Sequence, residues 1–139
     1  NTNNIVEDEY YSGKAINISK TTLPHSLSYF LTIKYNVSHG HAVALTLGFI
    51  GKINYNSGCD NLKKVMNDIC LMLHIDIKNF EKYWYNLMQV GGLETKLSNL
   101  GVKKEDLELI VDSVNVERLK NHPLNIEKEI LIKELNKIF

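Results

Sequence analysis

The sequence contains a single arginine, Arg118, and no excess of either charge, because 16 basic side chains balance 16 acidic ones over 139 residues. Proteins that bind nucleic acids through the phosphate backbone usually carry a net positive charge and clustered arginines. The charge balance therefore predicts no nucleic-acid partner. With 44% hydrophobic residues, the composition is that of an ordinary globular domain.

Long hydrophobic runs and cysteines are also scarce. The richest apolar stretch, residues 42–50, ends at Gly51 and is far shorter than the roughly 20 residues needed to cross a bilayer. We therefore expect no membrane partner. The two cysteines, Cys59 and Cys70, lack the CxxC spacing of redox and metal sites and the density of a secreted scaffold. This usage predicts reduced thiols, with Cys70 on an apolar helix face, and a cytoplasmic location.

Two further absences concern nucleotide binding and the start of the chain. No glycine-rich phosphate loop and no alternation of strands with helices occurs, so a nucleotide-binding domain is absent from this chain. The chain starts at Asn1 rather than methionine, without the basic and apolar regions of a signal peptide. We expect one helical domain, residues 1–139, that is a fragment of a longer protein.

Helical periodicity dominates the part of the chain after residue 60. Apolar side chains recur at helical spacing through residues 60–73 and 80–88, where Asp60 and Asp76 are placed to cap the two helices. The pair Gly91 and Gly92 predicts a left-handed stop after the second helix. A shorter stripe covers residues 107–114. Asn125, just past the breaker Pro123, is placed to cap a last helix.

The first third of the chain is also predicted to be helical. Residues 5–19 can form one helix, and Pro24 suits the first turn of another that runs to Ile33. Ser38 is a good cap for a third helix beginning at His39. The apolar residues 42–47 could instead form a buried strand, but their alanines and the upstream cap favour a buried helix. The predicted fold class is all-α, a bundle-like array of helices.

Three of the five histidines, His25, His39 and His41, crowd into one segment. Imidazole is the commonest metal ligand, and a histidine at the start of each of two neighbouring antiparallel helices can converge on one point. The positive end of the helix dipole disfavours imidazolium, so both rings keep a lone pair for a metal. On a helix His39 and His41 point in different directions, so only one of them is expected to join His25.

The alternative interpretation is that these are core or capping histidines bonded to the backbone, and spacing alone leaves the two interpretations evenly matched. His74, near a helix end, and His122, before a proline, are expected to have helix-terminus and turn roles.

Two stretches carry a resemblance to a known family. The first, residues 13–29, contains Pro-His25-Ser-Leu-Ser-Tyr29, and the second reads Ser-His39-Gly-His41-Ala-Val-Ala-Leu. Together they resemble the iron-containing alcohol dehydrogenases, whose helical C-terminal domain carries two metal-binding histidines at this fourteen-residue spacing. Leucines near Gly101, Arg118 and residues 121–123 are similar to the closing helices of that domain. The resemblance covers nearly the whole chain and implies the C-terminal part of that dehydroquinate synthase-like fold.

The resemblance also implies a chemistry. Family members bind one divalent metal, usually Fe2+ or Zn2+, through an aspartate and three histidines, and His25 and His39 match the last two ligands. The first two form an Asp-x3-His pair that has no counterpart here. The metal acts as a Lewis acid on an alcohol oxygen while hydride passes to NAD or NADP.

Two positions near these ligands bear on the branch of the family. Many members have a second histidine where this chain has Tyr29. The sequence around His25 and His41 is similar to that of the branch of phosphonoacetaldehyde reductases and sugar-acid oxidising enzymes. The resemblance therefore makes Tyr29 and His41 candidates for a position beside the substrate.

Three hypotheses follow. In the first, the chain is the metal-binding helical portion of an alcohol dehydrogenase or aldehyde reductase, inactive without its N-terminal portion, and an exposed apolar face makes it a homo-oligomer. In the second, it is a self-standing, non-catalytic helical interaction module with a polar surface. In the third, which we rank lowest, it is a small metal-binding protein that uses His25, His39 and His41 together.

Overall fold

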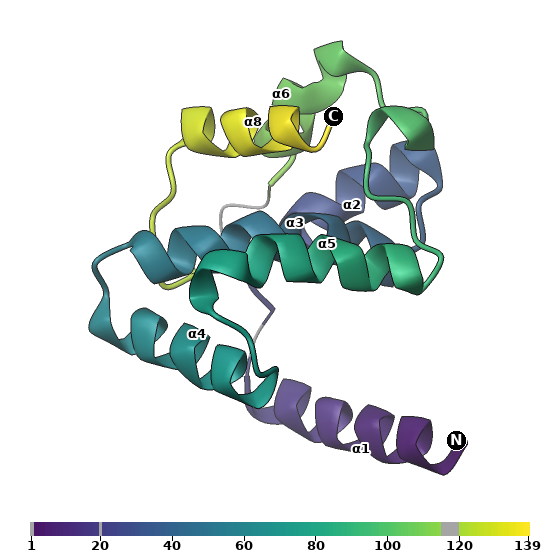
Figure 1. Ribbon diagram of the computed structural model, residues 1–139. Helices are drawn as coiled ribbons and strands as arrows, with labels where there is room; N and C mark the ends of the chain where they lie inside the picture. Colours follow the sequence, from purple (N-terminus) through teal and green to yellow (C-terminus); the bar gives the residue numbers. More distant parts are fainter. Residues whose placement is uncertain (1, 20, 115–119) are drawn as a thin grey trace.

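The computed structural model describes residues 2–19, 21–114 and 120–139, so Arg118 lies outside the described residues. These residues form helices and short 3-10 turns, with no strand among them, which confirms the all-α prediction (Figure 1). The helices are α1 (Thr2–Ile18), α2 (Leu23–Tyr35), α3 (His39–Asn56), α4 (Asp60–Met72), α5 (Phe80–Val90), α6 (Leu107–Asp112) and α8 (Lys128–Lys137). The 3-10 turns are η1 (Ile77–Asn79), η2 (Ser98–Leu100) and η3 (Lys104–Asp106).

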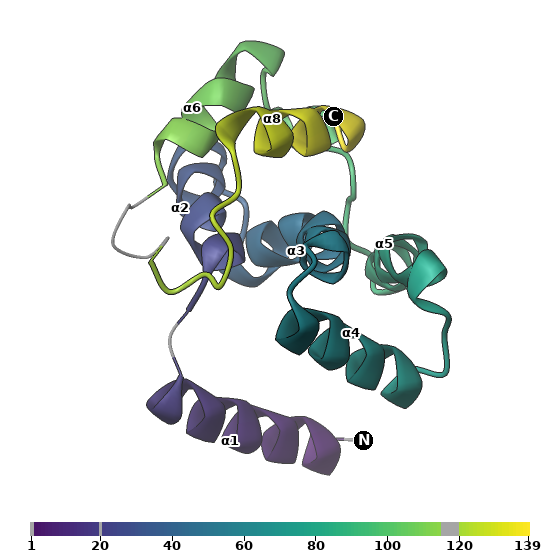
Figure 2. The ribbon, with the colours of Figure 1, turned by 90° about the vertical axis from the view of Figure 1, so that its left-hand side faces the viewer.

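Helix α3 is the centre of the fold. Helices α2 and α5 lie beside it, α8 lies over one side with α6 packed on α2 and α8, and α4 lies on the opposite side (Figures 1 and 2). Ala42, Leu45 and Phe49 of α3 are fully buried in the main core. A smaller cluster of Met66, Cys70 and Phe80 joins α4 to α5. The apolar run is therefore a buried helix rather than a strand, as its alanines indicated.

Two aromatic side chains of α5 fix it against α3. The indole N–H of Trp84 donates to the carbonyl oxygen of Ala44 at 2.8 Å, and the hydroxyl of Tyr85 donates to that of Leu45 at 3.1 Å. Both rings pack on the main core, and burial raises the pKa of Tyr85. The close approach favours a glycine, because a Cβ at Gly48 would lie 3.0 Å from the Tyr85 ring and the ring would have to shift.

The N-terminal caps differ from the sequence prediction. Asp60 is the first helical residue of α4 rather than its cap, so its carboxylate contributes through the helix dipole. Asp76 does cap a helical segment, because its side chain accepts from the backbone N–H of Lys78 in η1. The prediction for Asn125 is wrong: α8 starts three residues later, with Glu127 at the N-cap position. Tertiary packing, rather than such local signals, sets the residue at which each of these helices begins.

Left-handed residues end three helices. Gly92 has φ = 75° just past α5, which confirms the predicted stop there. His74, with φ = 54°, follows α4, and the next residue, Ile75, donates its N–H to the carbonyl of Cys70, which confirms the helix-terminus role of this histidine. Asn36, also at φ = 54°, ends α2 and turns the chain toward α3.

Helix α1 lies at the edge of the molecule, and no other described helix packs closely along it (Figure 2). Its large apolar side chains are all at least 57% exposed: Ile5, Val6, Tyr10, Tyr11, Ile16 and Ile18. They point to several sides of the helix rather than along one stripe.

The scarcity of apolar runs and cysteines has direct structural counterparts. Among the described residues, no helix is long and apolar enough to cross a membrane. Cys59 and Cys70 are both free thiols, and Cys70 is buried against α5 as its helix face predicted. Burial raises the pKa of the Cys70 thiol and so keeps it protonated and unreactive.

Candidate metal centre

The start of α3 lies beside the first two turns of α2, because the His39 side chain contacts both His25 and Ser28. The two helices run in opposite directions (Figure 1), and the connecting residues 36–38 fold back along α2. This return is held by the N–H of Val37, which donates to the carbonyl of Leu31 at 3.3 Å. The returning loop carries His39 back toward the start of α2, where His25 lies.

His25 and His39 converge, as predicted. Nδ1 of His25 lies 3.1 Å from Nε2 of His39, and the ring centres are 5.1 Å apart at an interplanar angle of 45°. His25 is half-buried and His39 is exposed, so the pair faces the surface. Each ring stands on the first turn of its helix.

Ser28 determines which nitrogen of His39 carries the proton. Its hydroxyl donates to the carbonyl oxygen of His25 at 2.7 Å, and its oxygen lies 3.1 Å from Nδ1 of His39. Because the hydroxyl proton is already used, the oxygen accepts and Nδ1 of His39 is the protonated nitrogen. Nε2 of His39 therefore presents a lone pair toward His25. Sequence reasoning missed Ser28, although its position one helical turn after His25 was a usable signal.

Tyr29 lies beside this pair. Its ring centre is 5.6 Å from that of His39 at an interplanar angle of 34°, and the side chain is 38% exposed. The structure therefore groups His25, His39 and Tyr29 on one surface.

His41 points elsewhere. Its Nε2 donates to the carbonyl oxygen of Glu94 at 2.6 Å. The Glu94 carboxylate in turn accepts the N–H groups of Lys96 and Thr95 and the amide of Asn99, and these bonds hold the pKa of Glu94 below its usual range. This anchoring confirms that His39 and His41 diverge, and it separates His41 from the histidine pair.

The pair has no third ligand in the described part of the chain. No group of three or more histidine, cysteine, aspartate or glutamate side chains able to hold a metal occurs there. The third hypothesis, a complete site built from His25, His39 and His41, does not agree with this arrangement.

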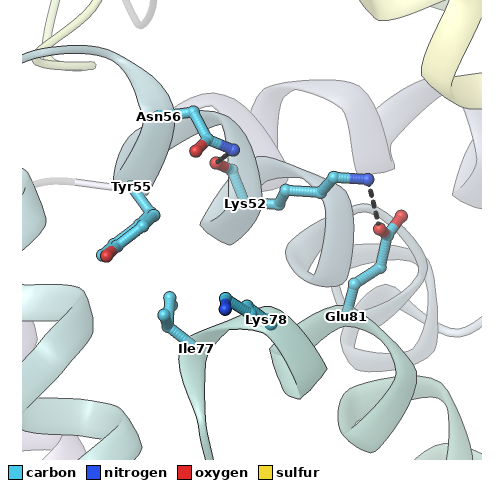
Figure 3. Close-up of a pocket in the computed structure, with 6 residues that line it drawn as sticks. All are labelled: Lys52, Tyr55, Asn56, Ile77, Lys78 and Glu81. Carbon is cyan, nitrogen blue, oxygen red and sulfur yellow. Dashed lines mark hydrogen bonds and ion pairs between the residues drawn. The ribbon is translucent and has the colours of Figure 1, made fainter.

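A separate surface hollow of about 280 Å³ lies between α3 and η1 (Figure 3). Tyr55 and Ile77 face each other across it, and the Nζ of Lys52 forms an ion pair of 2.8 Å with the Glu81 carboxylate at its edge. The hollow contains neither histidine of the pair. Its ion pair links α3 to α5, which is a structural role.

Comparison with known families identifies the class of protein to which this fold and this histidine pair belong. Residues 2–139 match the C-terminal part of the Fe-containing alcohol dehydrogenase family. The chain belongs to that family, as the two histidine-containing stretches indicated.

A curated relative points to the same branch as the sequence resemblance. A phosphonoacetaldehyde reductase of Streptomyces viridochromogenes is 39% identical over 46 residues, which are 33% of this chain and 12% of that protein. The matched segment is short, so it describes a local similarity.

Two solved structures share the fold. A sulfoacetaldehyde reductase from Bifidobacterium kashiwanohense, solved in complex with NAD+, aligns over 86% of this chain with a TM-score of 0.66 and 23% identity. An alcohol dehydrogenase from Oenococcus oeni aligns over 92% of this chain with a TM-score of 0.70 and 19% identity. The chain covers 31% and 35% of these two proteins, so it spans about a third of their length.

Proposed function

We propose that this chain is the C-terminal, metal-binding helical portion of a metal-dependent, NAD(P)-linked enzyme that interconverts small alcohols and aldehydes. The observation that carries the proposal is the 3.1 Å approach of Nδ1 of His25 to Nε2 of His39. Membership of the Fe-containing alcohol dehydrogenase family supports it. The sulfoacetaldehyde reductase with the same fold was solved with NAD+, which supports a nicotinamide cofactor.

The two histidines fit a divalent metal such as Fe2+ or Zn2+. Two ligands of one tetrahedral or octahedral ion lie roughly 3.0–3.4 Å apart, close to the separation of the two ring nitrogens. Ser28 already directs the lone pair of His39 toward this point. His25 donates to that lone pair, so it must move its proton from Nδ1 to Nε2 before both rings can hold the ion.

When bound, the metal would supply Lewis acidity that polarises the oxygen of the alcohol or aldehyde. The residues around it would position the substrate. Tyr29, beside His39 and partly exposed, is our candidate for direct contact with the substrate. His41 is a second candidate, whose ring orientation is fixed by the carbonyl of Glu94.

We further propose that the isolated chain has no dehydrogenase activity. Two imidazoles rarely hold iron or zinc in competition with water, and the described residues offer no third ligand beside them. The remaining ligands and the dinucleotide site would come from an N-terminal portion of a longer protein. The free cysteines agree with a cytoplasmic location for that enzyme.

The surface of α1 favours this proposal over a self-standing interaction module. A module that folds alone should have a polar surface, whereas Val6, Tyr11 and Ile16 of α1 are each more than 60% exposed. Such a helix is expected to pack against further protein.

Calorimetric titration of the isolated chain with Zn(II), and with Fe(II) under anaerobic conditions, tests the proposal. We expect submillimolar or weaker binding that disappears in His25→Ala and His39→Ala. The matched control is His74→Ala, since that histidine ends α4 away from the pair. Tight one-to-one binding would show that the metal site is complete in this chain. Equal binding by wild type and His39→Ala would exclude the histidine pair as ligands.

A further inference from the structure

A second candidate site lies in a cavity of about 350 Å³ between α3, α4 and α5, next to the start of α2. Its walls are mostly apolar and include Ile50, Val65, Ile69 and Trp84. Neither His25 nor His39 lines it, so it is distinct from the proposed metal centre. Its volume is in the range of small-molecule binding sites.

The walls restrict the charge of any ligand. Among the described residues that line the cavity there is no lysine, arginine, aspartate or glutamate. An ion entering such a space would lose its hydration without gaining a counter-charge. The cavity therefore favours neutral molecules.

Two polar side chains on the cavity wall have atoms without a partner among the described residues. Both ring nitrogens of His122 and Oδ1 of Asn54 are buried and form no hydrogen bond within that part of the chain. His122 is only 7% exposed, and burial lowers its pKa, so its ring is neutral at physiological pH. A neutral imidazole offers one N–H donor and one lone pair, and the Asn54 oxygen offers a second acceptor.

We propose that this cavity binds a neutral, largely apolar small molecule that carries a hydroxyl group, with the hydroxyl at His122 and Asn54. A hydroxyl can donate to one acceptor and accept the imidazole N–H at once, whereas an aldehyde or ketone can only accept. The alkyl part lies against Ile50, Val65 and Trp84. Because protein atoms enclose the His122 nitrogens and Oδ1 of Asn54, both side chains reach the ligand by rotating about χ2, a torsion with a broad minimum.

Trp84 provides a local reporter because it is the single tryptophan of the chain and lines the cavity. The experiment titrates the protein with a brominated hexanol, whose bromine quenches indole fluorescence on contact. We expect saturable quenching by the alcohol, and weaker binding of the matching bromohexanoate, which differs only in its charged head group.

Two variants test the residues. His122→Phe keeps a ring of similar size and should weaken the alcohol roughly two- to tenfold, the effect of one neutral hydrogen bond. Val65→Phe narrows the cavity and should abolish saturation. Leu87→Phe, the same kind of change on α5 outside the cavity, should bind as wild type. Thermal unfolding by circular dichroism shows that each variant is folded.

The proposal is overturned by linear quenching that never saturates, or by equal affinities in wild type, His122→Phe and Val65→Phe. Preference for bromohexanoate over the alcohol would also overturn it. None of these readouts depends on metal or nicotinamide binding, so the result is independent of the proposed enzyme function.

Discussion

The hydroxyl of Tyr35, the last residue of α2, donates a hydrogen bond to the carboxylate of Asp106, 71 residues further along the chain. The same hydroxyl accepts the backbone N–H of Lys103, and the Nζ of Lys34 pairs with Asp106 at 2.8 Å. Asp106 is 4% exposed. This cluster fixes the C-terminal end of α2 to the start of α6, and so it holds the helix that carries His25.

Replacing Asp106 should destabilise the fold. The hydrogen bonds from Lys34 and Tyr35 hold the pKa of the Asp106 carboxyl below its ordinary value of 3.8. Its contribution to stability is therefore fully present above pH 3.8 and is lost as the pH falls below that value. We expect Asp106→Asn to lower the urea midpoint at pH 7 and to reduce the loss of stability on acidification. The exposed neighbour provides the control, since Glu105→Gln should leave the midpoint nearly unchanged; an equal effect of both changes would contradict the assigned role.

Ser28 should control the proton of His39. In wild type, nitrogen-15 NMR of His39 should show the proton on Nδ1, because the Ser28 oxygen accepts it. Ser28→Ala removes that acceptor and should shift the tautomer toward Nε2–H. Metal affinity of the site should then fall roughly tenfold or more.

Ser26→Ala is a matched control for this experiment. Ser26 is also buried on α2, but its hydroxyl has no hydrogen-bond partner among the residues that the structure describes. An unchanged His39 tautomer in Ser28→Ala would show that the serine does not select it.

His122 should make the fold sensitive to mild acid. Burial lowers its pKa from the ordinary value of 6.5, so protonation favours the unfolded chain. Above pH 6.5 the ring is mostly neutral in both the folded and the unfolded chain. The free energy of unfolding falls as the pH drops below that value. Urea titration between pH 7.5 and 5, roughly the range in which histidines titrate, measures this effect. Over that range the free energy of unfolding should fall more steeply in wild type than in His122→Phe. Asn121→Ala, an exposed and non-titrating neighbour, should retain the wild-type slope.

Gly51 should not tolerate a side chain. A Cβ at this position would overlap the Phe80 ring and approach Met66 at 3.1 Å. Gly51→Ala is therefore expected to destabilise the protein by about 1–3 kcal/mol, the usual effect of overpacking. Gly13→Ala on α1 is the control, because its Cβ would meet no atom within 4 Å. A melting temperature equal to that of wild type for Gly51→Ala would mean that α3 and α5 separate easily.

The apolar surface of α1 should cause self-association of the isolated chain. Sedimentation velocity at increasing concentration is expected to show species larger than the monomer. The double variant Val6→Lys/Ile16→Glu replaces two exposed apolar residues and should shift the distribution toward monomer. Leu71→Glu, at an exposed position of α4, should not. A wild-type chain that stays monomeric at all concentrations would support the self-standing module.

Local sequence patterns predicted the helices well and their caps poorly. Apolar spacing placed α4, α5 and α6, and the pair Gly91 and Gly92 marked the end of α5. The caps expected at Asp60 and Asn125 did not form. A cap contributes about 1 kcal/mol, which packing of a whole helix easily outweighs.

The sequence by itself determined the all-helical class, the family, and the divergence of His39 from His41, because these depend on helical periodicity and on residue spacing. Only the tertiary structure brought the ring nitrogens of His25 and His39 within 3.1 Å. The same packing placed the Ser28 hydroxyl between the carbonyl oxygen of His25 and Nδ1 of His39. It also enclosed His122 beside an apolar cavity, which its place before a proline did not indicate. Such contacts depend on how helices cross and on how loop 36–38 returns along α2, and no local pattern encodes either.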